Sequence, residues 1–401
     1  MCLYRIHEVS DLKVDSIGGT EQTLNHMNKT LILAKRVRLR PTKEQETQLW
    51  KSVGTARWAY NWALAKQKES YKNKGKFISD GLLRKELTRL KQTDEFSWLY
   101  EVSNNITKQA IKDLCHAYEK FFKGLADQPR FKSKRKSKPS FYNENVKLKV
   151  KGKKVLIEKV GWVVVSECIP DKKYYNPRIS NDGKYWYLSV GIEESKPIVE
   201  LTNVSLGIDV GIKELAVCSD GTRKKNINKT SNVRRGEKRI RRLQRQISRK
   251  YEINKEGNRF VKTSNIIKIE KKIQHLYRRL TNIRLNHLHQ STSEIVKTKP
   301  YRIVMEAINI KGMMKNKHLS KAIAKQCLFK FKRQIQYKCE KYGIEFVEAN
   351  QWYTSSKTCS SCGNKKNDLN LSDRLYKCEC GHEIDRDINA AINLSRYKLV
   401  N

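Results

Sequence analysis

Three acidic residues in the second half of the chain stand where apolar segments begin or end. Asp209 lies within the alternating segment 204–218, which predicts two strands joined by a turn. Glu306 directly follows the apolar stretch 301–305, which predicts another short strand. Asp387 precedes a segment whose apolar residues share one helical face, so we expect it at the start of a helix.

Taken one at a time, these acids have ordinary explanations. Asp209 fits a turn residue, Glu306 an exposed strand end, and Asp387 a helix N-cap, which is a common role for Asp before a helix. Two strand-borne carboxylates and a third at a helix start suit Mg²⁺, because this ion prefers carboxylate and phosphate oxygens. Two such ions about 4 Å apart activate the attacking water and stabilise the leaving oxygen in phosphodiester cleavage. Together, the three acids predict a two-magnesium catalytic site.

Four cysteines lie in two close pairs, which are Cys359 with Cys362 and Cys378 with Cys380. Four thiolates in this arrangement fit a closed tetrahedral Zn²⁺ site, which is structural rather than catalytic. The second pair is separated by one residue instead of two, and His382 is the nearest substitute ligand. The pattern predicts one structural zinc ion.

The charge of the chain predicts a polyanionic partner. Its 84 Lys and Arg against 41 Asp and Glu leave a formal net charge of +43 over 401 residues. Such an excess repels itself in a free globule, and nucleic acid is the leading partner. The apolar runs are far shorter than the roughly 20 residues of a membrane helix, so we expect no span. No apolar leader is present at the start, which favours a cytoplasmic protein.

The elements that must position these residues follow from periodicity. Residues 41–122 read as helices, 146–192 as short strands of an antiparallel barrel, and 232–298 as a helical hairpin with an apolar seam. Basic residues gather in two places that we expect to contact nucleic acid: Lys132, Lys134, Arg135 and Lys136 between aromatics, and Arg241, Arg242, Arg245 and Arg249 on the hairpin.

From about Met27 to the C-terminus, and most specifically over 200–395, the sequence resembles the TnpB family, transposon-encoded RNA-guided nucleases related to type V CRISPR effectors. Asp209 stands in a segment similar to the first RuvC motif, and 303–313 is similar to the second. The segments 355–363 and 385–393 resemble the zinc element and the third motif. By motif position the resemblance assigns catalysis to the three acids, with Asp387 preferred over Asp385.

The resemblance implies an RNase H-like (RuvC) nuclease domain with an inserted zinc knuckle, preceded by a helical recognition domain and a β-barrel wedge domain. The expected parts are an N-terminal extension without order (1–26), the wedge (27–44 and 128–200), the helical domain (45–127), the nuclease domain (201–357 and 383–401) and the knuckle (358–382). It also implies an active-site loop at 316–320 and a reader of a short DNA motif at 77–84 and 104–112, with Asn104 and Lys108 as candidate contacts.

The resulting hypothesis is an RNA-guided DNA endonuclease of a transposable element, with two Mg²⁺ and one Zn²⁺ as cofactors. Its partners are a guide RNA from the transposon end and a double-stranded DNA target, and we expect a monomer on its RNA, at the nucleoid of a prokaryotic cell. Three alternatives stay open. They are a miniature CRISPR effector, a non-cleaving RNA-guided repressor, and an actin-like ATPase. The ATPase is supported only by the segment 207–211, which resembles a phosphate-binding turn.

Overall fold

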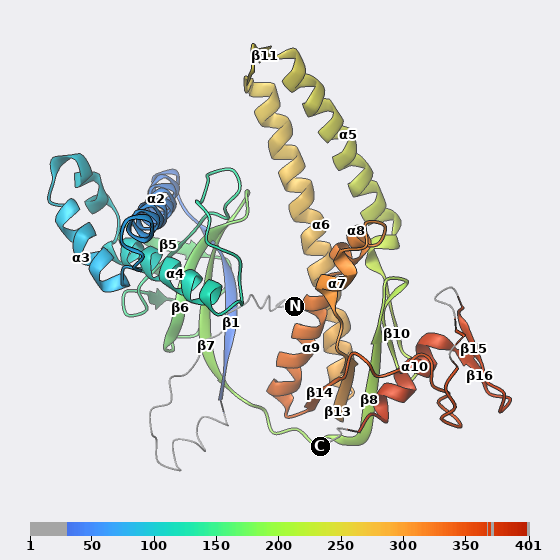
Figure 1. Ribbon diagram of the computed structural model, residues 1–401. Helices are drawn as coiled ribbons and strands as arrows, with labels where there is room; N and C mark the ends of the chain where they lie inside the picture. The colour runs from blue at the N-terminus through green and yellow to red at the C-terminus, as the bar shows by residue number, and fades with distance from the viewer. Residues whose placement is uncertain (1–29, 367, 370–372, 399–401) are drawn as a thin grey trace. The chain divides into compact units, whose positions relative to one another are not determined.

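The computed structural model describes residues 30–366, 368–369 and 373–398, so the expected extension 1–26 lies outside them. The chain forms two compact units, Met1–Ser195 and Lys196–Asn401 (Figure 1). In the described part of the chain, every helix is too short or too polar to span a bilayer.

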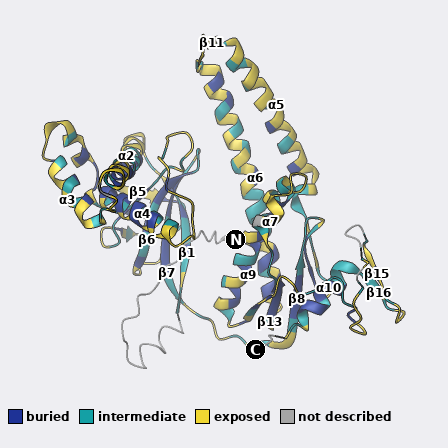
Figure 2. Cartoon of the chain, viewed as in Figure 1, coloured by how far each residue is buried: buried dark blue, intermediate teal, exposed yellow. Residues whose placement is uncertain are grey.

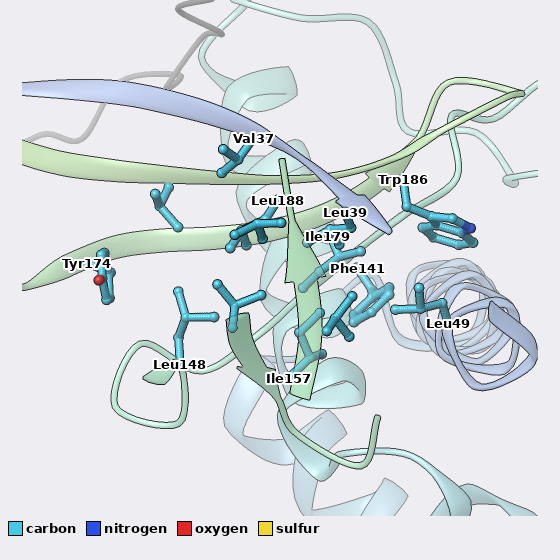
Figure 3. Packing of buried hydrophobic residues seen from close by; sticks show 14 of the residues in the cluster. Val37, Leu39, Leu49, Phe141, Leu148, Ile157, Tyr174, Ile179, Trp186 and Leu188 are labelled. Atoms are coloured by element: carbon cyan, nitrogen blue, oxygen red, sulfur yellow. The ribbon is translucent and has the colours of Figure 1, made fainter. Parts of the chain in front are cut away.

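The first unit contains a seven-stranded antiparallel sheet in the order β2-β6-β7-β1-β5-β4-β3. Its strands are β1 (Thr30–Arg40), β2 (Ser140–Tyr142), β3 (Lys149–Lys151), β4 (Lys154–Ile157), β5 (Gly161–Val165), β6 (Tyr174–Asn181) and β7 (Trp186–Ser195). The hydrogen-bonded order ends at β2 and β3, which have three residues each, so in the described part of the chain this is an open sheet rather than the closed barrel predicted from sequence. Its core includes Val37, Leu188 and Phe141 (Figure 3).

Strand β6 lies within the range 146–192 but outside the individual strands that the sequence pattern indicates there, which are 146–150, 155–157, 162–165 and 185–190. This strand contains Pro177, which cannot donate a hydrogen bond to a ladder. The pairing of β6 with β7 shifts register between Tyr175 and Arg178, and Asn176 has a positive φ of 44°. The bulge therefore accommodates Pro177 inside a strand.

The helices of the first unit are α2 (Lys43–Lys74), α3 (Asp80–Leu90), the 3₁₀ helix η1 (Asp94–Glu101) and α4 (Asn104–Phe122). Helix α2 begins as the sequence predicts, because Thr42 accepts from the Gln45 N–H and Gln45 accepts in return from the Thr42 N–H. Helix α4 lies within the range 41–122 predicted as helical and buries Ile111 and Leu114 on its apolar face, whereas Phe122 at its end is exposed.

The second unit is built on a mixed five-stranded sheet in the order β10-β9-β8-β13-β14. The strands are β8 (Thr202–Val210), β9 (Glu214–Cys218), β10 (Arg223–Lys225), β13 (Pro300–Glu306) and β14 (Glu345–Ala349). Strand β13 pairs in parallel with β8 and β14, and β8 pairs antiparallel with β9. One face of this sheet, with Ile208 and Ile303, packs on α6 and α9.

A long helical hairpin extends from this sheet (Figure 1). It consists of α5 (Ser231–Ile253) and α6 (Ser264–Lys297), joined by the two-residue strands β11 (Lys255–Glu256) and β12 (Arg259–Phe260). The predicted seam is confirmed in part, because Ile240 and Leu280 are buried together with Ile273 partly buried beside them. The outer surface of the hairpin is exposed (Figure 2).

The remaining elements are shorter. They are the 3₁₀ helix η2 (Ile227–Lys229), α7 (Ile310–Met314), α8 (Ser320–Gln326), α9 (Leu328–Tyr342), β15 (Leu375–Lys377), β16 (Glu383–Asp385) and α10 (Arg386–Ser395). Helix α10 covers the second face of the five-stranded sheet and packs mainly on β8.

Candidate active site

The sheet brings Asp209 and Glu306 side by side. Met305 of β13 pairs with Ile208 of β8 in a parallel ladder, and the two acids follow these partners by one residue each. Because carboxyl ends of parallel strands meet at one edge and side chains in register share a face, both carboxylates lie on the same side of the sheet. Asp209 therefore lies in a strand and not in a turn, and Glu306 ends its strand as predicted.

Gly207 brings α10 onto the same side of the sheet. A Cβ at Gly207 would lie 1.9 Å from the carbonyl oxygen of Ala391 and 2.4 Å from the nitrogen of Ser395, so the helix backbone rests directly on this glycine. Two residues earlier on β8, the Ser205 hydroxyl donates to the Ser395 carbonyl at 2.7 Å. Gly207 and Ser205 lie on the face that carries Asp209 because strand side chains alternate.

The spacing of these contacts places the third acid. Four residues of a helix advance about 6 Å along its axis, and two residues of a strand advance about 6.6 Å. A step of four residues on α10 therefore nearly matches a step of two residues on β8. Helix α10 thus runs opposite to β8, with Ser395 over Ser205 and Ala391 over Gly207. The next step of four along the helix brings Asp387 over Asp209.

Electrostatics couple the three acids. Burial raises the pKa of Asp209 to about 8, and the negative charges of Asp387 and Glu306 act in the same direction, while Arg386 acts in the opposite direction. Burial also raises the pKa of Glu306. Like charges held together disfavour ionisation unless a cation joins them.

Asp385, and not Asp387, is the N-cap of α10. Its Oδ1 accepts hydrogen bonds from the N–H groups of Asp387 (2.9 Å) and Ile388 (3.2 Å). Burial opposes its ionisation, but the Ile388 N–H and the nearby Arg223 outweigh burial and hold the pKa of Asp385 below its ordinary value. Since Asp385 has the capping role, the Asp387 side chain is left to face the other acids, with the guanidinium of Arg386 at 3.6 Å.

The acid site fits magnesium by its donor set. All three acids are only partly buried, so water-bearing ions can reach them. In the described part of the chain, the group of side chains whose ligand atoms already lie close enough together to hold a metal ion is a different one, the four thiols. The carboxylates are thus coupled electrostatically without forming a closed cage, which suits Mg²⁺ because it keeps several waters and takes few protein ligands.

The four predicted cysteines come together. Their sulfur atoms all lie within 4.8 Å of one another, with 3.8 Å between Cys359 and Cys380 and 3.5 Å between Cys362 and Cys378. Although burial opposes it, backbone N–H groups lower the pKa of Cys359 to about 7. His382 instead lies 3.3 Å from the Ser360 hydroxyl, so the close second pair contributes both of its thiols.

Two asparagines that the sequence patterns did not single out attach the cysteine module to α10. Asn389 donates to the Thr358 carbonyl and accepts from the Ser360 N–H, at 2.7 and 2.8 Å. Asn393, one turn later, donates to the carbonyls of Ser355 and Thr358, both at 2.7 Å. Both side chains are buried. The signal that could have identified them is a pair of amides four residues apart on an otherwise apolar helix face.

The basic residues of the hairpin form a stripe on α5. Lys238, Arg241, Arg245 and Arg249 line an open depression together with Gln244 and Ser248. Arg242 is also exposed but lies outside this lining.

The basic residues near 131–141 differ from one another. Lys134, Arg135 and Lys136 are exposed. Lys132 is half-buried, with its ammonium 3.6 Å from the centroid of the Tyr60 ring, and burial lowers its pKa. Lys132 therefore packs inside the first unit.

The remaining candidates lie at helix ends and in a loop. Asn104 begins α4 and accepts a hydrogen bond from the ammonium of Lys91, while Lys108 is exposed. The segment 316–320 connects α7 to α8, with the Asn316 side chain accepting from the His318 N–H.

Comparison with known proteins agrees with these features. Three family models match, described as "Helix-turn-helix domain" (27–76), "Probable transposase" (188–317) and "Cas12f1-like, TNB domain" (329–394), and together they span more than half of the chain. The first description does not fit the structure, since the described residues there form one strand and one continuous helix, β1 and α2.

Relatives match along most of the chain. A Streptomyces pristinaespiralis protein named "Putative RNA-guided DNA endonuclease" is 29% identical over 90% of this chain and 88% of its own length. One from Escherichia coli K12, "Putative RNA-guided DNA endonuclease InsQ", is 29% identical over 90% and 91%. Among solved structures, a Cas12f1-sgRNA-target DNA complex matches with a TM-score of 0.55 and 18% identity, over 88% of this chain and 83% of the other.

These likenesses define a protein of mixed α/β content with the fold of the Cas12f1 chain. The acids and the cysteine module lie in segments that the second and third family models match. The chain belongs to the TnpB family, as its sequence predicts.

Proposed function

We propose that this chain is an RNA-guided DNA endonuclease that hydrolyses phosphodiester bonds at Asp209, Glu306 and Asp387. The observation that carries the proposal is the convergence of three acids from β8, β13 and α10, where burial first, and then the charges of Asp387 and Glu306, raise the pKa of Asp209. Relatives spanning most of the chain bear the name of this activity.

The acids would hold two Mg²⁺ ions, which supply an activated water and stabilise the leaving oxygen. Asp209 and Glu306 fix two carboxylates on the rigid sheet edge, and Asp387 completes the set from α10. Arg386 partly offsets their mutual repulsion before a cation binds. The second unit is thereby a RuvC-type nuclease domain.

The cysteine module would hold one Zn²⁺. A tetrahedral ion with Zn–S bonds of about 2.3 Å requires sulfur atoms roughly 3.8 Å apart. Two of the six separations, 3.5 and 3.8 Å, are close to this requirement, and all of them are within 4.8 Å. Because Asn389 and Asn393 bind the same module to α10, this zinc would also support the helix that carries Asp387.

The guide RNA and the DNA target would occupy the basic surfaces. The protein would contact the sugar–phosphate backbone of the RNA–DNA heteroduplex, and base pairing between guide and target would provide the sequence specificity. The exposed residues Lys134, Arg135 and Lys136, the stripe on α5, and Asn104 with Lys108 are the proposed contacts. We further propose that the first unit contains the wedge and the helical recognition parts, that one chain serves one RNA, and that the particle acts at the nucleoid.

Asp209→Ala tests the activity. The variant should lose cleavage of a guide-matched duplex while retaining RNA-dependent DNA binding in a gel-shift assay. Asp220→Asn is the matched control, because this exposed acid accepts from the Thr222 N–H in a turn and Asn preserves that role. Full cleavage by purified Asp209→Ala protein excludes the assignment.

The origin of the guide separates two versions of this function. Likeness to the Cas12f1 fold also fits a miniature CRISPR effector. Sequencing of the RNA that copurifies with the protein distinguishes them, since a species from the 3′ flank of the gene supports the transposon role and repeat-derived RNA supports the other.

A further inference from the structure

Asp385 connects three parts of the second unit. It ends β16 and pairs with Leu375 of β15 in the cysteine module. Its Oδ1 caps α10 through the N–H groups of Asp387 and Ile388. Its other oxygen, Oδ2, lies 3.2 Å from Nη2 of Arg223 on β10. One carboxylate therefore joins the module, the helix start and the edge of the sheet.

Arg223 is held from a second side as well. Its Nη1 lies 3.2 Å from Oε2 of Glu214, the first residue of β9. A guanidinium presents several donors in a fixed planar fork, so one Arg bridges two carboxylates in a defined direction. A Lys, with a single nitrogen, does not reproduce that bridge.

The sheet register relates Arg223 to the acid site. Arg223 pairs with Val217 of β9, and Val217 pairs with Asp209 of β8. Residues in one row of an antiparallel sheet share a face, so Arg223 and Asp209 both face the α10 side, roughly 10 Å apart across two strand spacings. The start of α10 is thus anchored in the row that carries Asp209.

We propose that Arg223 and Asp385 form a positioning pair that sets the affinity of the acid site for divalent cations. Repulsion among Asp209, Glu306 and Asp387 pushes the start of α10 away from the sheet. The cap and the ion pair oppose this displacement and keep the Asp387 carboxylate over Asp209. Both residues of the pair would act through Asp387 and not on the substrate. The inference rests on the proposed nuclease site.

Three substitutions separate the ion pair from the cap. Arg223→Gln removes the charge and leaves the cap intact. Asp385→Asn leaves a good N-cap, since Asn caps as well as Asp, but removes the carboxylate that Arg223 holds. The double variant closes a mutant cycle. Glu383→Gln is the matched control, because its exposed ion pair with Lys377 lies in the same β-ribbon and outside the cap and the Arg223 bridge.

The first measurement is Mn²⁺ binding to the full chain freed of nucleic acid, followed by electron paramagnetic resonance. Binding that Asp209→Asn abolishes is counted as the acid site. We expect Arg223→Gln and Asp385→Asn each to weaken that binding about 10-fold, the size typical of residues that orient metal ligands. The double variant should be no weaker than either single one, and Glu383→Gln should bind like the wild type.

The second measurement is the Mg²⁺ concentration that half-saturates cleavage by the RNA-bound protein. It should rise by the same factor, and excess Mg²⁺ should restore the rate, whereas Arg223→Lys should recover only part of the affinity. Two results would overturn the inference while leaving the nuclease function intact. One is a lowered melting temperature with unchanged Mn²⁺ affinity. The other is a loss of Mn²⁺ affinity in the double variant that equals the product of the losses in the two single variants. If Asp209→Asn changes neither Mn²⁺ binding nor cleavage, the proposed function itself fails.

Discussion

Replacing Gly207 with Ala tests the placement of α10 most directly. The added methyl group would lie 1.9 Å from the carbonyl oxygen of Ala391, whereas a carbon and an oxygen normally approach to about 3.4 Å. Helix and strand must therefore separate by roughly 1.5 Å. Since the obstacle is backbone, no rotation of a side chain on α10 removes it.

The expected cost has two parts. Forcing a methyl group into a packed interface destabilises a protein by about 1–3 kcal/mol, which exceeds the smaller gain from the reduced entropy of an unfolded Ala. Moving α10 also moves Asp387, and a displacement of about 1 Å in a catalytic group costs about 100-fold in rate. We expect both effects in Gly207→Ala, the first in chemical denaturation and the second in single-turnover cleavage.

Gly211→Ala is the matched control. This glycine follows Asp209 closely, but a Cβ there meets its nearest atom, the Glu214 carbonyl oxygen, at 3.6 Å, an ordinary contact. It should retain stability and cleavage. Ala391→Gly should not rescue Gly207→Ala, because the clash is with the backbone. Wild-type stability and cleavage in Gly207→Ala would refute the close approach and with it the placement of Asp387.

Three further outcomes are expected. In metal-free protein the pKa of Asp209, about 8, exceeds the value near 4 of an unfolded chain, so the free energy of unfolding should fall as pH rises from about 4 to about 8. Asp209→Asn should flatten that fall in thermal melts recorded with EDTA, and an unchanged slope would contradict the shift. Elemental analysis should find one zinc per chain, absent from Cys380→Ser and kept in His382→Ala; the reverse pattern would reassign the fourth ligand. Arg245→Ala should weaken RNA binding and reduce the steepness of its salt dependence by about 0.7–0.9 for each phosphate that the protein no longer neutralises, whereas Arg239→Ala, away from the stripe, should change neither.

Local patterns were sufficient for many elements. The helices that begin just after residue 41, the strand that carries Asp209 and the strand that ends at Glu306 all occur where the sequence indicates them. The convergence of Cys359 with its three partners also follows from spacing alone. Each of these signals is contained in a short segment, within one helical turn, one strand or one pair of ligands.

Other features depend on contacts that no local pattern contains. The role of Asp385 was ambiguous, because capping by Asp385 or Asp387 differs by two residues and only the backbone of α10 decides it. Strand β6 was hidden by Pro177, whose bulge is defined by its partner strands.

The sequence by itself determined which chemical groups are present and that acids, thiols and basic residues exist at suitable spacings. Only the tertiary structure decided how they act together. In the sequence, Gly207 looks like any glycine in a strand. Its role in the close approach of α10 is visible only in the fold, because the contacting residue, Ala391, lies nearly two hundred residues away along the chain. The raised pKa of Asp209 likewise comes from burial and from the charges of Asp387 and Glu306, which tertiary structure brings beside it, since electrostatic energy depends on distance in space rather than along the chain.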